Sequence, residues 1–390
     1  MIEPRLRFKA DDGSDFPDWE EKKIASLGDM VGGGTPTTKK KEYWHGKTAW
    51  ISSADVEEND IYNINMTRFI TQEAIDNSAT KIIPKNSILI VSRVGVGKVA
   101  KAPCDLCTSQ DFTNIVDVKG DSTFLTYAVL RLMQSKLQCV QGTSIKGIPS
   151  DEIRNYIMNV PSLPEQQKIA DFLSTIDTVI EKQQATVSAW EERKKGVMQK
   201  LFSQEVRFKA DDGSDFPELE AKSLFDICEY KNKQSVGKNY VGTENMKQNF
   251  SGLESLDEET EMKGVCYCKG DTLMSNIRPY LRKTWKADRE GVCSTDVLVF
   301  HPIDVVSEYL HYLIASDKFI SYVMTGVKGV KMPRGDKEHM MKFSIMVPSL
   351  PEQQKIADCL SALDAVIEKQ KETLEKWQEL KKGLLQQMFV

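Results

Sequence analysis

The chain lacks the long apolar runs that membrane-spanning proteins require. Apolar stretches such as Ile88–Val91 are far too short to cross a bilayer. The first residues, MIEPRLRFKADDGSD, contain no apolar segment of the kind that a secretory signal needs. We therefore expect a cytoplasmic protein that makes no membrane contact.

Cysteine and histidine are present, but their spacing does not predict a metal centre. Eight cysteines without a secretory context do not indicate a disulfide framework. The pairs Cys104-x-x-Cys107 and Cys266-x-Cys268 could each be half of a zinc site, yet neither has a second pair at zinc-finger spacing. The four histidines form no H-E-x-x-H pair. We predict no metal site in this chain.

Catalytic motifs are incomplete throughout the sequence. Gly95-x-Gly97-x-x-Ala100 fits a loose dinucleotide pattern, but no acidic residue follows at the required distance in a strand–helix–strand unit. Val99 follows Gly97-Lys98 where a phosphate loop has Ser or Thr. The Asn/Asp-Pro-Pro-Tyr/Phe tetrapeptide of amino-methyltransferases is absent. We infer that the chain is not an enzyme and holds no cofactor.

The net charge of −5 argues only weakly against nucleic acid as a partner, because basic residues are clustered. Residues 81–102 contain five bases and no acid, and residues 263–289 contain seven bases and two acids. The charge pattern therefore leaves nucleic-acid binding open.

Two long repeats divide the chain into two modules of about 1–206 and 207–390. RFKADDGSDFP occurs at 7–17 and again at 207–217. VPSLPEQQKIADFLSTIDTVIEKQ at 160–183 returns at 347–370 with 20 of 24 positions identical. The repeats enclose variable segments, 18–159 and 218–346. Short β-branched, apolar runs around Val91–Arg93, Thr272–Met274 and Val297–Phe300 predict strands there, and helical patterns appear at 125–139 and 307–325. The variable segments are therefore expected to be mixed α/β domains.

The second repeat predicts a long amphipathic helix in each module. Ser162-Leu-Pro-Glu165 matches a capping box. Apolar residues then alternate by four and three from Ile169 to Leu201, and from Ile356 to Met388, with polar interruptions at equivalent places. Each helix needs a partner for its apolar stripe. The other helix of the same chain is the simplest partner, and pairing between two chains is the alternative.

These features together resemble the specificity (S) subunit of type I restriction–modification systems. The SLPEQQKIADFLSTID and SLPEQQKIADCLSALD segments resemble the conserved spacer regions of that family. Further short segments resemble its target-recognition signatures. In the first module they are Gly33-Gly-Thr35-Pro36, Tyr43-Trp44, Trp50-Ile-Ser52-Ser53-Ala-Asp55, Ser92-Arg93 and Ser109-Gln110-Asp-Phe112. In the second they are Gly242-Thr243-Glu244-Asn245, Ser275-Asn276-Ile-Arg278-Pro279-Tyr280 and Ser294-Thr295-Asp296.

The resemblance implies two globular target-recognition domains joined by two long antiparallel coiled-coil helices, with a pseudo-twofold internal repeat. The expected boundaries are 1–160 and 204–347 for the recognition domains, and 161–203 and 348–390 for the spacer helices. Each domain would read one half of a bipartite double-stranded DNA site. The helices would set the spacer and dock two methyltransferase subunits, and two motor–nuclease subunits would join the complex. S-adenosylmethionine, ATP and Mg²⁺ would belong to those partners.

Side chains that can contact base edges or phosphates are the predicted DNA-binding residues. In the first domain they are Thr35, Ser52, Ser53, Arg93, Lys98, Ser109, Gln110 and Lys146. In the second they are Thr243, Asn245, Asn276, Arg278, Tyr280, Lys283, Ser294, Lys331 and Arg334. Among them Lys98, Lys146, Lys283, Lys331 and Arg334 are predicted phosphate contacts. Two other functions fit the residues: a coiled-coil assembly protein whose variable domains bind proteins, and a stand-alone DNA-binding regulator.

Overall fold

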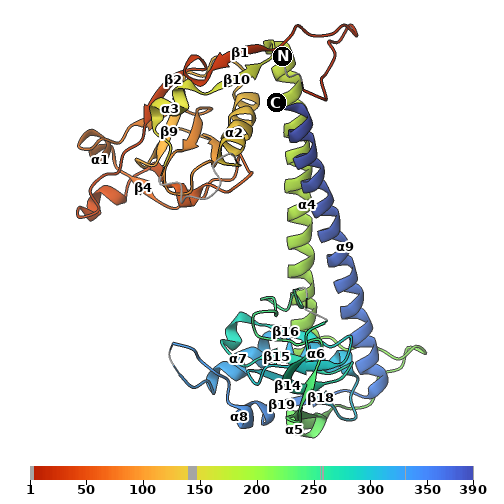
Figure 1. Cartoon of the computed structure of the whole chain (residues 1–390). Helices are drawn as coiled ribbons and strands as arrows, with labels where there is room; N and C mark the ends of the chain where they lie inside the picture. Colours follow the sequence, from red (N-terminus) through yellow and green to blue (C-terminus); the bar gives the residue numbers. More distant parts are fainter. Residues whose placement is uncertain (1–3, 139–146, 255, 257–258, 330, 390) are drawn as a thin grey trace. The chain divides into compact units, whose positions relative to one another are not determined.

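The computed structural model describes residues 4–138, 147–254, 256, 259–329 and 331–389. It divides into two compact units, residues 1–183 with 373–390, and residues 184–372. Each unit holds one variable domain and one end of each long helix (Figure 1). Among the described residues no helix is both long and apolar enough to cross a membrane.

The first domain is built on a central antiparallel sheet of order β2-β9-β6-β7. Its strands are β2 (Asp29–Gly32), β9 (Phe112–Val116), β6 (Ile88–Val91) and β7 (Val99–Lys101). A second sheet, β4-β3-β8-β5, consists of β4 (Phe69–Ile70), β3 (Thr48–Ile51), β8 (Leu106–Thr108) and β5 (Ile82–Ile83). The remaining elements are β1 (Glu20–Lys23) paired with β10 (Ile157–Val160), the helices α1 (Gln72–Asp76), α2 (Ser122–Gln138) and α3 (Ser150–Asn155), and the 3-10 turns η1 (Ile24–Ser26), η2 (Lys41–Trp44) and η3 (Ser53–Asp55).

Strand β6 is apolar at every position because both faces of the central sheet are covered. Ile88 and Ile90 pack with residues of α2, whereas Leu89 and Val91 pack with residues of β3 and β8. Strands buried on both sides read as continuous apolar runs rather than as alternating ones. Because β6 is buried along its whole length, the end of the strand also determines where the following loop begins.

The second domain repeats this arrangement with different residues. Its central sheet, β12-β18-β15-β16, consists of β12 (Cys228–Lys231), β18 (Val297–Pro302), β15 (Thr272–Ser275) and β16 (Thr284–Lys286). The second sheet consists of β13 (Gln234–Gly237), β14 (Met262–Tyr267) and β17 (Gly291–Cys293). The other elements are β11 (Glu220–Ser223) paired with β19 (Ser344–Val347), the helices α5 (Leu224–Ile227), α6 (Ser307–Ile314), α7 (Asp317–Thr325) and α8 (Lys337–Met341), and the turn η4 (Pro279–Leu281).

The expected mixed α/β domains and internal repeat are confirmed, with two local corrections. The helix predicted at 307–325 is two helices, because Ser316 breaks the first and caps the second, its hydroxyl accepting from the Phe319 N–H at 3.2 Å. The strand predicted around Val91 ends at that residue, and Ser92 and Arg93 begin a loop.

The two long helices are α4 (Leu163–Ser203) and α9 (Leu350–Met388), and they pair within the one chain. In the first unit Ile169 and Leu173 of α4 share a core with Leu385 and Met388 of α9. In the second unit Leu201 of α4 shares a core with residues from the start of α9. The beginning of each helix thus lies beside the end of the other, which makes the pairing antiparallel. The apolar seam that predicted the helices is the surface that joins them.

The predicted capping box at the start of α4 is wrong. The Ser162 hydroxyl is buried without a hydrogen-bond partner among the described residues. Glu165 instead accepts from the Arg7 guanidinium at 3.1 and 2.9 Å. Arg207 and Glu352 repeat this pair at 3.0 and 2.6 Å. A buried carboxylate needs a charged partner more than the helix end needs a cap, since unpaired burial of charge is costly.

The leader repeat folds as a hairpin against the start of the helix repeat. Lys168 binds the Lys9 carbonyl at 2.8 Å and Asp11 at 2.5 Å, and Lys355 makes the equivalent contacts to Lys209 and Asp211. The leader repeat and the start of the helix repeat therefore form one packed unit, and the chain contains two copies of that unit. This explains why they occur together at both places in the sequence.

Candidate nucleic-acid interface

In the first domain three loops meet at one edge of the central sheet. The loop after β6 joins the turn before β9, because the Asp111 carbonyl accepts from the backbone N–H groups of Ser92 and Arg93 at 2.8 and 3.2 Å. The same turn joins the end of β3 through a 2.9 Å bond from Ser109 N–H to the Ile51 carbonyl. Sequence segments that are far apart are thus held side by side.

Thr35 and Gln110 form the exposed centre of this loop cluster. The Thr35 hydroxyl donates to Oε1 of Gln110. Gly33 and Gly34 permit the approach, because a Cβ on Gly33 would meet the Ser109 carbonyl and one on Gly34 would meet the backbone of Ala79. The Gly-Gly-Thr motif therefore places a hydroxyl beside an amide that can bind a base edge.

Arg93 is the exposed cation of the first domain's loop cluster. Its side chain forms no hydrogen bond or ion pair with the part of the chain that the structure describes. The neighbouring Val94 is 74% exposed. A free guanidinium beside an exposed methyl group suits the major groove, where Arg binds guanine and apolar groups contact the thymine methyl. Sequence reasoning missed Val94, since a lone apolar residue carries no motif.

The second domain carries an equivalent cluster around the loop after β15. Asn276 N–H donates to the Asp296 carbonyl at 2.8 Å, and Arg278 N–H donates to the Pro333 carbonyl at 2.8 Å. Arg334 forms an ion pair with Asp296 at 3.1 Å. The loop at 294–296 is tied to Val241 by a 2.9 Å bond from Ser294 N–H. Four segments that the sequence singled out thus lie together.

Arg278 is held in a strained backbone conformation on this loop. Its φ is +50°, although it is neither Gly nor Asn and precedes Pro279. The left-handed region costs about 1–2 kcal/mol for such a residue. Like that of Arg93, its exposed guanidinium forms no hydrogen bond or ion pair within the described ranges. Strain that aims a free cation outward is typical of a binding loop.

Lys98 and Lys283, like Arg334, are predicted phosphate contacts whose side chains bind within their own domain. Lys98 donates to the Val56 carbonyl at 2.9 Å, and Lys283 donates to the Thr243 carbonyl at 2.8 Å. Both lysines follow the central loop by equivalent spacing and clamp the neighbouring segment. Their role in DNA binding stays a prediction.

The other predicted residues differ in how open they are. Ser53, Ser109 and Asn276 are buried, and Ser109 donates to Asp111 at 3.0 Å. Ser52 bonds Asp55, and Asn245 accepts from Gly242 N–H at 2.8 Å. The exposed members are Thr35, Arg93, Gln110, Arg278, Tyr280, Lys331 and Arg334. Lys146 lies outside the described residues.

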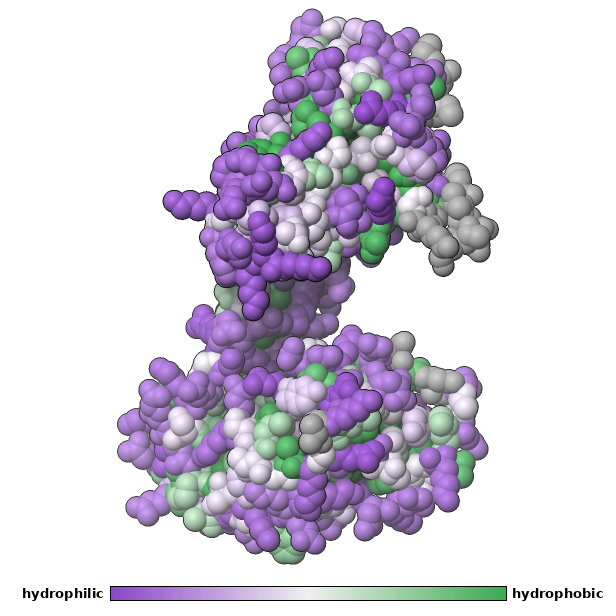
Figure 2. All heavy atoms as spheres, turned by 90° about the vertical axis from the view of Figure 1, so that its left-hand side faces the viewer, coloured by the Kyte–Doolittle hydropathy of each residue, from purple (hydrophilic) through white to green (hydrophobic). Residues whose placement is uncertain are grey.

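The face of each domain that Figure 2 presents is largely hydrophilic, with scattered apolar patches. In the part of the chain that the structure describes, no group of three or more His, Cys, Asp or Glu residues could hold a metal ion.

Comparison with known proteins places this architecture in a family. The model of the type I restriction modification DNA specificity domain matches the chain twice, at 17–187 and 217–376. The MjaIX specificity subunit of Methanocaldococcus jannaschii is 33% identical over 280 residues, which are 68% of this chain and 63% of that protein. The MjaVIII specificity subunit of the same organism is 23% identical and covers 95% of this chain and 92% of its own. The match to MjaIX thus spans less than two thirds of that relative.

Solved structures show the same fold. The S subunit of a type I restriction–modification system from M. genitalium superposes with a TM-score of 0.57 at 17% identity, covering 100% of this chain and 99% of its own. A chain from a study of type I complex assembly gives a TM-score of 0.59 at 14% identity, covering 95% and 97%. The two-domain arrangement with long helices is therefore shared at low sequence identity.

Proposed function

The chain belongs to the family of type I restriction–modification DNA specificity proteins, and from that membership we propose how it works. Each variable domain reads one half of a bipartite double-stranded DNA site. Helices α4 and α9 hold the two readers at a set spacing and dock the catalytic subunits. The chain supplies sequence recognition, and its partners supply the chemistry.

One observation carries this proposal: each domain presents an exposed arginine, with no side-chain partner among the described residues, from the equivalent loop of its central sheet. Arg93 follows β6, and Arg278 follows β15. Arginine in the major groove binds guanine in a bidentate manner, which is the commonest specific protein–DNA contact. Two equivalent readers in one chain match a target with two separated halves.

The helix pair supports the role of a spacer. Polar layers interrupt its seam at Lys194 and Lys381, and each lysine meets an aspartate of the opposite helix, Asp364 at 2.5 Å and Asp177 at 2.6 Å. Polar pairs inside an apolar seam fix the register of paired helices. Half-sites read from one face of DNA lie about one helical turn, ~34 Å, apart. An unread spacer of roughly five to eight base pairs follows from that turn length.

The partners that this function requires are two methyltransferase subunits and two motor–nuclease subunits. S-adenosylmethionine would bind the former, and ATP with Mg²⁺ the latter. Because the substrate is chromosomal DNA, the complex would act in the cytoplasm. This assignment makes the present chain the non-catalytic member of an enzyme complex.

Coexpression with its methyltransferase, followed by mapping of methylated adenines, tests the proposal. The expected result is one motif with two short specified halves and an unspecified spacer. If the chain were a stand-alone regulator, specific DNA binding would occur without a methyltransferase in the purified complex. If it were an assembly protein, bipartite DNA would produce no sequence-specific, salt-dependent shift.

A further inference from the structure

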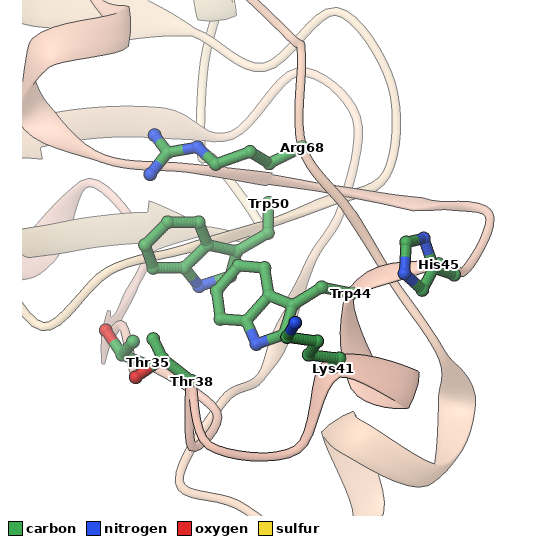
Figure 3. Close-up of a pocket in the computed structure, with 7 residues that line it drawn as sticks. All are labelled: Thr35, Thr38, Lys41, Trp44, His45, Trp50 and Arg68. Atoms are coloured by element: carbon green, nitrogen blue, oxygen red, sulfur yellow. The ribbon is translucent and has the colours of Figure 1, made fainter.

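A pocket of about 370 Å³ opens beside the loop cluster of the first domain (Figure 3). A volume of this size falls in the range of ligand-binding pockets. Seven residues line it: Thr35, Thr38, Lys41, Trp44, His45, Trp50 and Arg68. Thr35 also donates to Gln110, so the pocket adjoins the exposed centre of the predicted reading surface.

Two indole rings form its aromatic wall. The rings of Trp44 and Trp50 meet edge to face, with centroids 5.1 Å apart and planes at 84°. Trp50 is fixed from behind, because its Nε1–H donates to the Gly34 carbonyl at 2.9 Å. Trp44 is only partly buried. The two rings thus pack against each other, and a hydrogen bond holds Trp50 in place.

Arg68 completes the wall as a flat cation. Its guanidinium lies 4.6 Å from the centroid of the Trp50 ring and is held there by Asp55 and Ser52. Stacked arginine and tryptophan planes are the surfaces on which proteins stack unpaired bases. None of the sequence motifs includes Arg68, which directly precedes β4.

The rim is positive and hydrogen-bonding. Lys41 is exposed and forms no hydrogen bond or ion pair with the described residues, and His45 stands apart from the indoles in Figure 3. Thr38 adds an exposed hydroxyl. None of the seven lining residues is acidic. An aromatic interior with a cationic rim matches a base attached to a phosphate.

We propose that this pocket receives one unstacked base of the DNA that the first domain reads. The inference rests on the proposed function and adds to it a mode of recognition. The base would stack against Trp44, its edge would meet the Thr35 and Thr38 hydroxyls, and its phosphate would meet Lys41. Stacking on aromatic side chains offsets part of the cost of unpairing the base.

Mismatch scanning tests this proposal in the complex with the methyltransferase subunits. Binding is measured for duplexes that carry a single mismatch at each position in and beside the first half-site, excluding the methylated adenine. Most mismatches weaken binding. A mismatch at the extruded position should instead strengthen it by roughly threefold or more, because the pair no longer has to be broken.

Two pocket variants and one control test whether this pocket binds the unstacked base. Trp44→Ala removes the stacking surface, and Thr38→Trp fills the pocket from an exposed position without removing core atoms. Both should abolish the mismatch gain and leave recognition of the second half-site unchanged. Phe225→Ala, which removes an exposed aromatic ring of the second domain, should keep the gain.

Two results would overturn the proposal. One is that no position gains affinity on mismatch while bipartite binding remains specific. The other is a gain that persists unchanged in Trp44→Ala and Thr38→Trp. Loss of specific binding to any bipartite DNA would instead contradict the proposed function itself, so the two failures are distinguishable.

Discussion

Lys381 of α9 forms an ion pair with Asp177 of α4, with Nζ 2.6 Å from Oδ1 and both side chains almost nine-tenths buried. The Tyr127 hydroxyl donates to the other oxygen of Asp177. Lys194 and Asp364 repeat the pair at 2.5 Å, with Tyr312 donating to Asp364 at 2.7 Å. Each helix therefore contributes one lysine and one aspartate to these two pairs. Each of these side chains binds the oppositely charged residue on the other helix.

Breaking one of these pairs should destabilise the helix pairing. Lys381→Ala leaves the buried Asp177 without its cation, and we expect the free energy of unfolding to fall by about 3 kcal/mol in urea titration. Lys371→Ala is the matched control, because its pair with Glu191 is more exposed and should contribute less than about 1 kcal/mol. Equal losses in the two variants would show that the polar layer has no special role.

Helix length should control the spacer of the DNA site. Insertion of one heptad into α4 alone shifts the apolar residues of α4 relative to those of α9, so the two seams no longer pair. Methylation of the original motif should therefore be lost. Matched insertions in α4 and α9 lengthen the pair by about 10 Å, which corresponds to roughly three further base pairs at 3.4 Å each. Methylation mapping reads the spacer directly. Retention of the original motif after the single insertion would contradict the intramolecular spacer.

Replacing the arginine of one domain should affect only that domain's half-site. Arg278→Ala should relax or abolish recognition in the second half, with about 1–3 kcal/mol less discrimination at one base pair. Arg93→Ala should do the same in the first half. Competition binding with single-base variants of each half measures the change. An equal loss in both halves would argue against independent readers.

The stability of the second unit should fall in mild acid because of His311 on α6. Burial lowers the pKa of His311 to about 4, with a smaller contribution from Lys194. Its Nδ1 is inaccessible and has no hydrogen-bond partner among the described residues. An unfolded histidine has a pKa near 6.5. Between these values the unfolded chain binds more protons, so the free energy of unfolding falls as the pH falls from 6.5 towards 4.

At pH 5.5 this single group should remove about 1 kcal/mol relative to neutral pH. His311→Gln lacks the titrating ring and should lose that part of the pH dependence. Urea unfolding of both proteins at pH 7 and pH 5.5 gives the comparison. If the two proteins lose stability equally, His311 is not the titrating group.

The helices were predictable from the sequence, but their polar layers were not. A four-and-three alternation of apolar residues is a local pattern, and it predicted α4 and α9 closely. Lys194 and Lys381 looked like interruptions of the apolar seam, because the aspartate that pairs with each lysine lies on the other helix. Each of these aspartates is also one position away from the seam, so no local pattern links it to its lysine. Glu165 looked like a helix cap for the same reason: Arg7, its partner, is 158 residues away.

The candidate interface was predictable by segment and less so by residue. The loops that carry the motifs could be located from the sequence, because strand ends follow from buried apolar runs. Their role in reading DNA stays a prediction. Which side chain of a motif points outward depends on long-range packing. That packing buries Ser109 and leaves Gln110 exposed. It also brings Arg68 to Trp50 from a segment that has no motif of its own.

Domain replacement tests the central claim most directly. The variable segment 218–346 is exchanged for a second copy of 18–159, and the chain is expressed with its methyltransferase for mapping of methylated adenines. If the two domains read DNA independently and the helices hold them antiparallel, the motif should be symmetric. The first half-site would then be repeated in inverted orientation across an unread spacer. An unchanged asymmetric motif would contradict the account.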